Sequence, residues 1–197
     1  MKKLIFSKIK YYLGRMLSLL LDPFHFKKVL VVGDSHARVF NNPNFKIYFP
    51  LIKFDVCSIG GATISGLENP NSKTNANKKF RNKINQGKKS TIIFLLGEVD
   101  TGFVIFYRAE KYQESIENML EQTLLKYQEL LKYSLSVGND LILISTPLPV
   151  IADGNNWGEV AKLRKSVKTP LKERMNLTKD FNKKMSVFCQ INSIKYV

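Results

Sequence analysis

A serine near the start of the chain stands where a nucleophile would. Ser35 lies in the segment 33–37, with the sequence GDSHA, directly after the continuous apolar run 28–33. An apolar run that ends in Gly-Asp-Ser is typical of a buried strand that turns into a helix. At such a turn the hydroxyl is exposed and the first free amides of the helix point toward an approaching oxygen. The alternative interpretation is structural, with Asp34 or Ser35 acting as a plain helix N-cap.

Two further segments at expected strand ends carry groups that suit the same chemistry. Gly60 and Gly61 follow the second apolar run, and glycine lets a backbone N–H approach a ligand closely. Glu98 and Asp100 follow the third apolar run, where either carboxylate could bind a sugar hydroxyl or an arginine. A structural salt bridge is the alternative for both acids.

The order of these runs predicts an α/β fold. Strands alternate with helical patterns, which implies right-handed crossovers, a parallel five-stranded sheet and a three-layer sandwich. Ligands of such sheets bind at the C-terminal ends of the strands, where the unusual residues lie. We expect strands at 28–33, 51–59, 91–96, 141–145 and 194–197, and the clearest helices at 109–137 and 170–190.

The motifs in this order resemble the SGNH (GDSL-type) hydrolase superfamily, and GDSHA is similar to the SGNH domains of bacterial polysaccharide O-acetyltransferases. The resemblance covers about residues 28–197 and implies a flavodoxin-like domain. It implies a serine esterase or O-acyltransferase that acts on acylated carbohydrate through an acyl-serine intermediate. Its catalytic residue would be Ser35, with the N–H of Ser35 and of Gly60 or Gly61 as the oxyanion hole. Its substrate contacts would come from Asp34, His36, Glu98 and Asp100.

Two departures from the family pattern bear on catalysis. Val99 occupies the position of the family's oxyanion-binding Asn, and no histidine follows His36, although the family places Asp-x-x-His after the last strand. His36 is a poor substitute, because adjacent helical residues diverge by about 100°. We therefore expect a chain that lacks its C-terminal block. The alternatives are a non-catalytic SGNH-like domain that binds glycan or protein, and a membrane-surface adaptor for which the fold is only a scaffold.

The net charge of +15 is concentrated in two segments. Residues 1–22 predict a separate amphipathic helix with a basic face, suited to an anionic membrane surface or to packing on the domain or on a partner subunit. Residues 71–90 are Lys/Asn-rich, and this composition is typical of a solvated surface or of a basic helix that contacts lipid or phosphate. Nucleic acid is a poor partner here, because Phe80 is the only aromatic residue in that segment. We expect a cytoplasmic protein, peripheral on the inner face of the membrane.

The sequence suggests neither a metal nor another cofactor. It contains two cysteines in no CxxC spacing and two histidines, which argues against a zinc site or a disulfide framework. Near the N-terminus the apolar stretches are far shorter than the roughly 20 residues that span a bilayer. They are also too short for a secretory signal.

Overall fold

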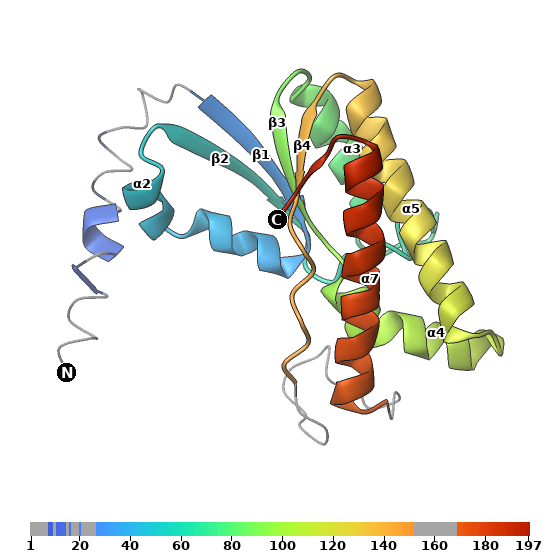
Figure 1. Cartoon of the computed structure of the whole chain (residues 1–197). Helices are drawn as coiled ribbons and strands as arrows, with labels where there is room; N and C mark the ends of the chain where they lie inside the picture. Colours follow the sequence, from blue (N-terminus) through green and yellow to red (C-terminus); the bar gives the residue numbers. More distant parts are fainter. Residues whose placement is uncertain (1–7, 10, 15, 17–19, 21–26, 152–168) are drawn as a thin grey trace.

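The computed structural model describes residues 8–9, 11–14, 16, 20, 27–151 and 169–197. Its centre is a parallel sheet of five strands, as the sequence predicts, and the strand order is β2-β1-β3-β4-β5 (Figure 1). Each expected strand is present, with ends that differ by a few residues at most. The strands are β1 (Lys27–Gly33), β2 (Ile52–Ser58), β3 (Thr91–Leu95), β4 (Asp140–Leu143) and β5 (Lys195–Tyr196).

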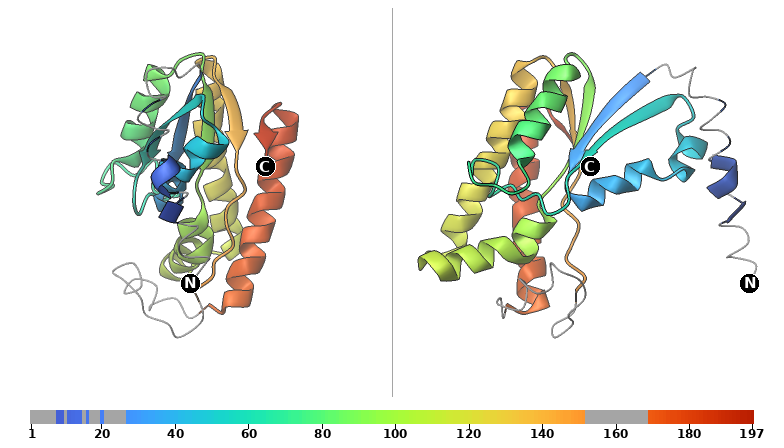
Figure 2. Two further views of the ribbon diagram at one scale, coloured as in Figure 1. Left: turned by 90° about the vertical axis from the view of Figure 1, so that its left-hand side faces the viewer. Right: turned by 180° about the vertical axis from the view of Figure 1, so that it is seen from behind.

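Helices cover both faces of this sheet and complete the three layers. One face packs against α3 (Ala76–Gln86), α5 (Ile116–Ser136) and α7 (Leu171–Ile191). The other face carries the short 3-10 helix η2 (Ser35–Asn41), and α2 (Asn44–Tyr48) follows it on the same side. Figure 1 and the right-hand view of Figure 2 show the long helices on one side and η2 with α2 on the other.

The continuous apolar sequence of β1 follows from this double coverage. Leu30 and Val32 contribute to the core beneath the long helices, whereas Val29 and Val31 belong to a second cluster with Ala37 of η2. All four strand residues are at most 5% exposed. A strand in the middle of a parallel sheet buries both faces, so its sequence does not alternate.

The helix predicted over 109–137 is two helices. The first, α4 (Ile105–Tyr112), ends at Gln113, whose φ of 56° is left-handed and terminates the helical path. The second, α5, begins after Ser115, whose side chain accepts a hydrogen bond from the N–H of Asn118. The periodicity runs through both helices because both pack on the same core, and it therefore conceals the break.

The basic segment 71–90 contains α3, which is a core helix on one side. Phe80 and Ile84 are fully buried against the sheet, and Lys78 and Lys79 are exposed. The apolar spacing therefore holds α3 on the domain, and its cations face solvent. Contact of those cations with lipid or phosphate stays a prediction.

Parts of the predicted N-terminal helix fall within the described residues. Residues 8–9, 11–14, 16 and 20 have helical backbone, but an unbroken helix over 1–22 stays a prediction. Gly14 lies against Pro43, because a Cβ built on it would come within 2.4 Å of the Pro43 carbonyl oxygen. The described members of the expected apolar face are 45–65% exposed, namely Ile9, Tyr12, Leu13, Met16 and Leu20. Among the described residues, no helix is both long and apolar enough to cross a bilayer.

Candidate active site

The register of the three central strands brings the predicted turns together. Gly33, the last residue of β1, pairs with Ser58 of β2 on one side and with Leu95 of β3 on the other. The segments that follow these three residues therefore leave the sheet side by side at its C-terminal edge. Ser35, Gly60 and Gly97 each stand two residues beyond that common level, as the sequence predicts.

Gly33 makes the close approach of β1 to its neighbours possible. A Cβ at this position would lie 2.3 Å from the carbonyl oxygen of Leu95 and 2.8 Å from the Cβ of Ala37. Neither contact is tolerable for a larger residue. The glycine therefore lets η2 begin directly over the end of β3.

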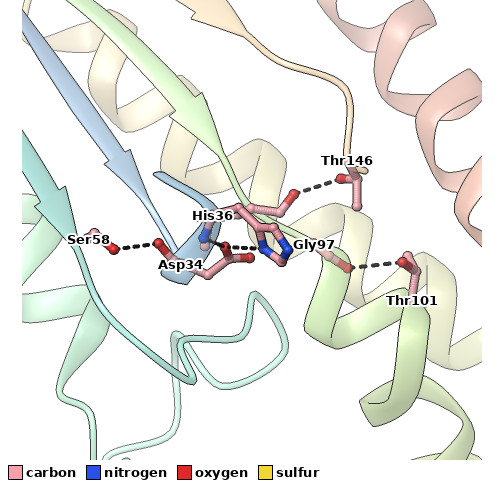
Figure 3. A network of polar contacts seen from close by, with 7 residues as sticks. Asp34, His36, Ser58, Gly97, Thr101 and Thr146 are labelled. Atoms are coloured by element: carbon pink, nitrogen blue, oxygen red, sulfur yellow. Dashed lines mark hydrogen bonds and ion pairs between the residues drawn. The ribbon is translucent and has the colours of Figure 1, made fainter. Parts of the chain in front are cut away.

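Asp34 is the residue that caps η2. Its carboxylate is buried and accepts hydrogen bonds from the backbone N–H of His36 at 2.8 Å and from Nδ1 of the same residue at 2.9 Å (Figure 3). Its backbone carbonyl accepts from Ser58 Oγ at 2.6 Å, and its N–H donates to the Leu95 carbonyl at 3.3 Å. The capping interpretation is thus confirmed for Asp34, and Ser35 is left exposed at the first position of the helix.

His36 is positioned by Asp34. The imidazole is exposed, and its Nδ1 lies against the carboxylate that caps the helix. When Nδ1 carries a proton it donates to that carboxylate, which leaves Nε2 as the basic nitrogen. Substrate binding by Asp34 and His36 stays a prediction.

The two glycines after β2 form a tight turn. The N–H of Ala62 donates to the carbonyl of Ile59 at 3.1 Å, so Gly60 and Gly61 are the central residues. Gly61 has φ of +71°, the value that a type II turn requires at its third position. The hydrogen bond of the turn uses neither central N–H, and both glycines are exposed. This arrangement leaves two amides for an oxyanion, and their catalytic part stays a prediction.

The turn after β3 is held from two directions. Gly97 has φ of +119°, and a Cβ there would lie 2.6 Å from Thr146 Oγ1. Thr146 donates through Oγ1 to the carbonyl of Leu96 at 2.7 Å, and Thr101 donates to the carbonyl of Gly97 (Figure 3). From α7, the amide of Asn182 accepts from the N–H and donates to the carbonyl of Thr146.

Asp100 stabilises a loop. The side chain is fully buried, and its two carboxylate oxygens accept the backbone N–H groups of Ile64 at 2.7 Å and Ser65 at 3.0 Å. Burial raises the pKa of this carboxyl from 3.8 to about 6, against the lowering effect of the two amides. Among the described residues Asp100 binds backbone amides and forms no salt bridge, and substrate binding by Asp100 stays a prediction. Its side chain ties the segment after β2 to the segment after β3.

The remaining members of this turn face different surroundings. Glu98 is buried, and its Oε1 lies beside Gly102 in the π-helical turn η3 (Asp100–Val104), 3.3 Å from where a Cβ would stand. Val99 is half-buried at the position of the family's asparagine. Substrate binding by Glu98 stays a prediction.

Sequence reasoning missed the residues that support the turns. Thr101, Thr146 and Asn182 are polar side chains from three separate segments, and no spacing in the sequence links them. Among the described residues, no three His, Cys, Asp or Glu side chains gather as a metal site would require.

The solved structures that are similar to this chain include SGNH and GDSL-type hydrolases. A candidate acylhydrolase from Bacteroides fragilis matches with a TM-score of 0.56 and 18% identity, over 87% of this chain and 66% of its own. A GDSL-like lipase from Bacteroides thetaiotaomicron matches with 0.57 and 16% identity, over 87% and 67%. A candidate SGNH hydrolase from Slackia heliotrinireducens matches with 0.50 and 13% identity, over 86% and 77%.

The chain therefore has the α/β fold of the SGNH hydrolases, as the resemblance of its motifs implied. It spans about two thirds of the length of the two Bacteroides proteins. No family model and no curated protein matches the sequence. Identities this low establish the fold, and the chemistry has to be argued from the site itself.

Proposed function

We propose that this protein is an SGNH-type serine esterase or O-acyltransferase that acts on acylated carbohydrate. The observation that carries the proposal is the position of Ser35. Ser35 is exposed at the start of η2, directly after β1. β1 lies between β2 and β3, and the turns that follow these three strands leave the sheet at the same level. Asp34 performs the capping, so the neighbouring serine is available for chemistry.

The reaction would begin with attack of Ser35 Oγ on the carbonyl carbon of the sugar ester. The tetrahedral oxyanion would accept hydrogen bonds from the N–H of Ser35 and of Gly60 or Gly61. Collapse breaks the bond to the sugar oxygen, which leaves as a hydroxyl with the proton that the serine gave up. Water or an acceptor hydroxyl then attacks the acyl-serine and restores Ser35.

Residues 1–197 should react slowly, because they offer few groups that could act as the general base for Ser35. A well-placed general base contributes about 10²- to 10⁴-fold. Only His25 and His36 occur in the sequence, and His25 lies outside the described residues. Val99 also supplies no oxyanion donor, and loss of one such donor costs roughly 10²- to 10³-fold in other acyl-transfer enzymes.

Active-site labelling tests this proposal without requiring turnover. A fluorophosphonate probe should form an adduct with the wild-type chain, located at Ser35 by peptide mass spectrometry. Ser35→Ala should abolish the adduct, and Ser136→Ala should not, because Ser136 is an exposed serine at the end of α5, where the strands begin. An acetylated oligosaccharide should be deacetylated slowly with the same dependence on Ser35. Equal labelling of the Ser35→Ala variant would overturn the proposal.

The second candidate is a non-catalytic domain that binds glycan or protein. Val99 favours it, because valine supplies no oxyanion donor. A folded chain that binds an oligosaccharide but shows no Ser35-dependent adduct or deacetylation would establish this second function.

We also propose that residues 1–21 attach the protein to the inner face of the membrane. Five cations and no acid occur in this segment. The described side chains of its expected apolar face are 45–65% exposed, which supports a surface outside this chain as their partner. Attachment there would suit an enzyme that works on lipid-linked or envelope glycan.

A further inference from the structure

A pocket outside the candidate active site lies beside residues 63–69, the segment that follows Gly60 and Gly61. Its volume is about 610 Å³, within the range of small-molecule sites. Its walls come from residues 63–69, from the η3–α4 segment and from α5, and the right-hand view of Figure 2 shows the segment after β2 crossing beside α5. Ser35, Gly60 and Gly61 do not line it.

Two cations converge on this pocket. Arg108 Nη1 donates to the carbonyl of Ser65 at 3.1 Å, and Lys126 Nζ approaches the same oxygen at 3.3 Å. Lys126 also forms an ion pair with the half-exposed Glu68 at 3.8 Å. Arg108 and Lys126 thus share one carbonyl oxygen, and Lys126 also faces the carboxylate of Glu68.

Arg108 retains unused hydrogen-bonding capacity. Its Nε is buried and has no acceptor among the described residues. A guanidinium offers five N–H donors in a planar fork that matches a carboxylate. A buried charged donor without an acceptor is unfavourable, and an incoming anion on the guanidinium would offset that cost.

Aromatic rings form the rim of the same pocket. Tyr107 is 37% exposed and stacks on Phe103, with 5.7 Å between ring centroids. Tyr112 is 53% exposed, and the guanidinium of Arg108 lies 5.6 Å from its ring centroid. Tyrosines of this kind present an apolar ring face and a polar hydroxyl to the same ligand. A sugar ring, with C–H groups on its faces and hydroxyls at its edge, matches both.

We propose that this pocket binds a sugar that carries a carboxylate, a uronate unit of the glycan on which Ser35 acts. The identification of the ligand as part of the substrate rests on the proposed function. Arg108 would donate hydrogen bonds to the carboxylate, and Tyr107 and Tyr112 would pack against the sugar ring. A neutral sugar would use the tyrosines alone and would leave Arg108 with its bond to the Ser65 carbonyl as its one hydrogen bond among the described residues.

The pocket is coupled to the Ser35 region through one loop. Asp100 fixes the amides of Ile64 and Ser65, and the carbonyl of Ser65 receives Arg108. The glycine turn is only a few residues upstream in the same segment. A uronate held by Arg108 would thus fix the register of the glycan relative to Ser35, which makes Arg108 a positioning residue.

Binding to an acylation-deficient chain tests the inference. The Ser35→Ala variant of residues 1–197 is titrated by calorimetry with a galacturonate tetrasaccharide and with its carboxyl-reduced, neutral counterpart. We expect the acidic ligand to bind about 10- to 100-fold more tightly, and added salt to reduce the difference. Arg108→Met should remove most of this preference, and Arg108→Lys should leave an intermediate one, because lysine keeps the charge without the planar fork.

Lys88→Met is the matched control, because it removes one exposed cation at the opposite edge of the sheet, and it should bind like the parent. Tyr107→Ala should weaken both oligosaccharides. Equal affinity for the acidic and neutral ligands, or an unchanged preference in a folded Arg108→Met variant, would overturn the inference. Inorganic phosphate binding as tightly as the uronate would also overturn it, since an anion alone would then suffice. Because no acyl transfer is measured, these outcomes are independent of whether Ser35 is a nucleophile.

Discussion

Replacement of Asp100 by asparagine should change the pH dependence of stability in a defined direction. The carboxyl has a pKa of about 6 in the folded chain and 3.8 ordinarily, because burial disfavours its charge. Between these values the folded state binds more protons than the unfolded state, so this group makes the free energy of unfolding fall as pH rises. Above about pH 7 the decrease is complete, at about 3 kcal/mol.

The magnitude follows from the two pKa values. Between pH 5 and pH 8 the contribution of Asp100 to the free energy of unfolding should fall by roughly 1 to 2 kcal/mol. Asp100→Asn cannot titrate, so the variant should gain stability relative to wild type by that amount over the same interval. Urea unfolding of both proteins at pH 5 and pH 8 measures the difference directly.

Asp55→Asn is the control for this measurement. Asp55 is an exposed acid that pairs with Lys83 on the surface, where an ion pair contributes about 0 to 1 kcal/mol. Its stability relative to wild type should change by less than about 0.5 kcal/mol between the two pH values. If the difference between Asp100→Asn and wild type is the same at pH 5 and pH 8, the burial argument for Asp100 is refuted.

Three other substitutions and one deletion provide further tests. Phe80→Ala should lower the free energy of unfolding by about 3 to 5 kcal/mol in urea titrations, because the ring is fully buried beneath the sheet. Gly97→Ala should destabilise the chain by more than about 1 kcal/mol, because φ is left-handed and the new methyl meets Thr146. Gly61→Ala, with open space around it, should have a smaller effect, and comparable thermal shifts for the two would contradict this reasoning. Deletion of residues 1–21 should abolish most salt-sensitive binding to anionic vesicles in co-sedimentation, and unchanged binding would direct attention to other cations.

The sheet and the placement of Ser35 could be predicted from local sequence. A strand buried on both faces reads as an unbroken apolar run, and the Gly-Asp-Ser that ends the first run marks the turn. Parallel strands have their C-terminal ends at the same edge of the sheet. Recognising the apolar runs as parallel strands was therefore sufficient to predict that the turns after them lie close together. The resemblance to the SGNH hydrolases added the expected flavodoxin-like fold, and the structure shows a parallel sheet of five strands.

The part played by Asp100 could not be read in the same way. Its partners are backbone amides of Ile64 and Ser65, and every residue except proline has such an amide. No side-chain pattern marks them. The break at Gln113 was missed for a related reason, because the left-handed residue is not glycine and the apolar period continues beyond it.

The two hydrogen bonds between the Asn182 side chain and the Thr146 backbone have a consequence for the order in which parts of the candidate site form during synthesis. During synthesis Ser35 is among the first residues of the domain to emerge, whereas Asn182 emerges on the order of 10 s later at typical elongation rates. Until α7 docks, the turn at Gly97 lacks the support that Thr146 receives from that helix. A nascent chain would thus carry its serine beside an unfinished turn until α7 has been made. When α7 docks, Asn182 supports Thr146, and the turn at Gly97 near Ser35 is then complete.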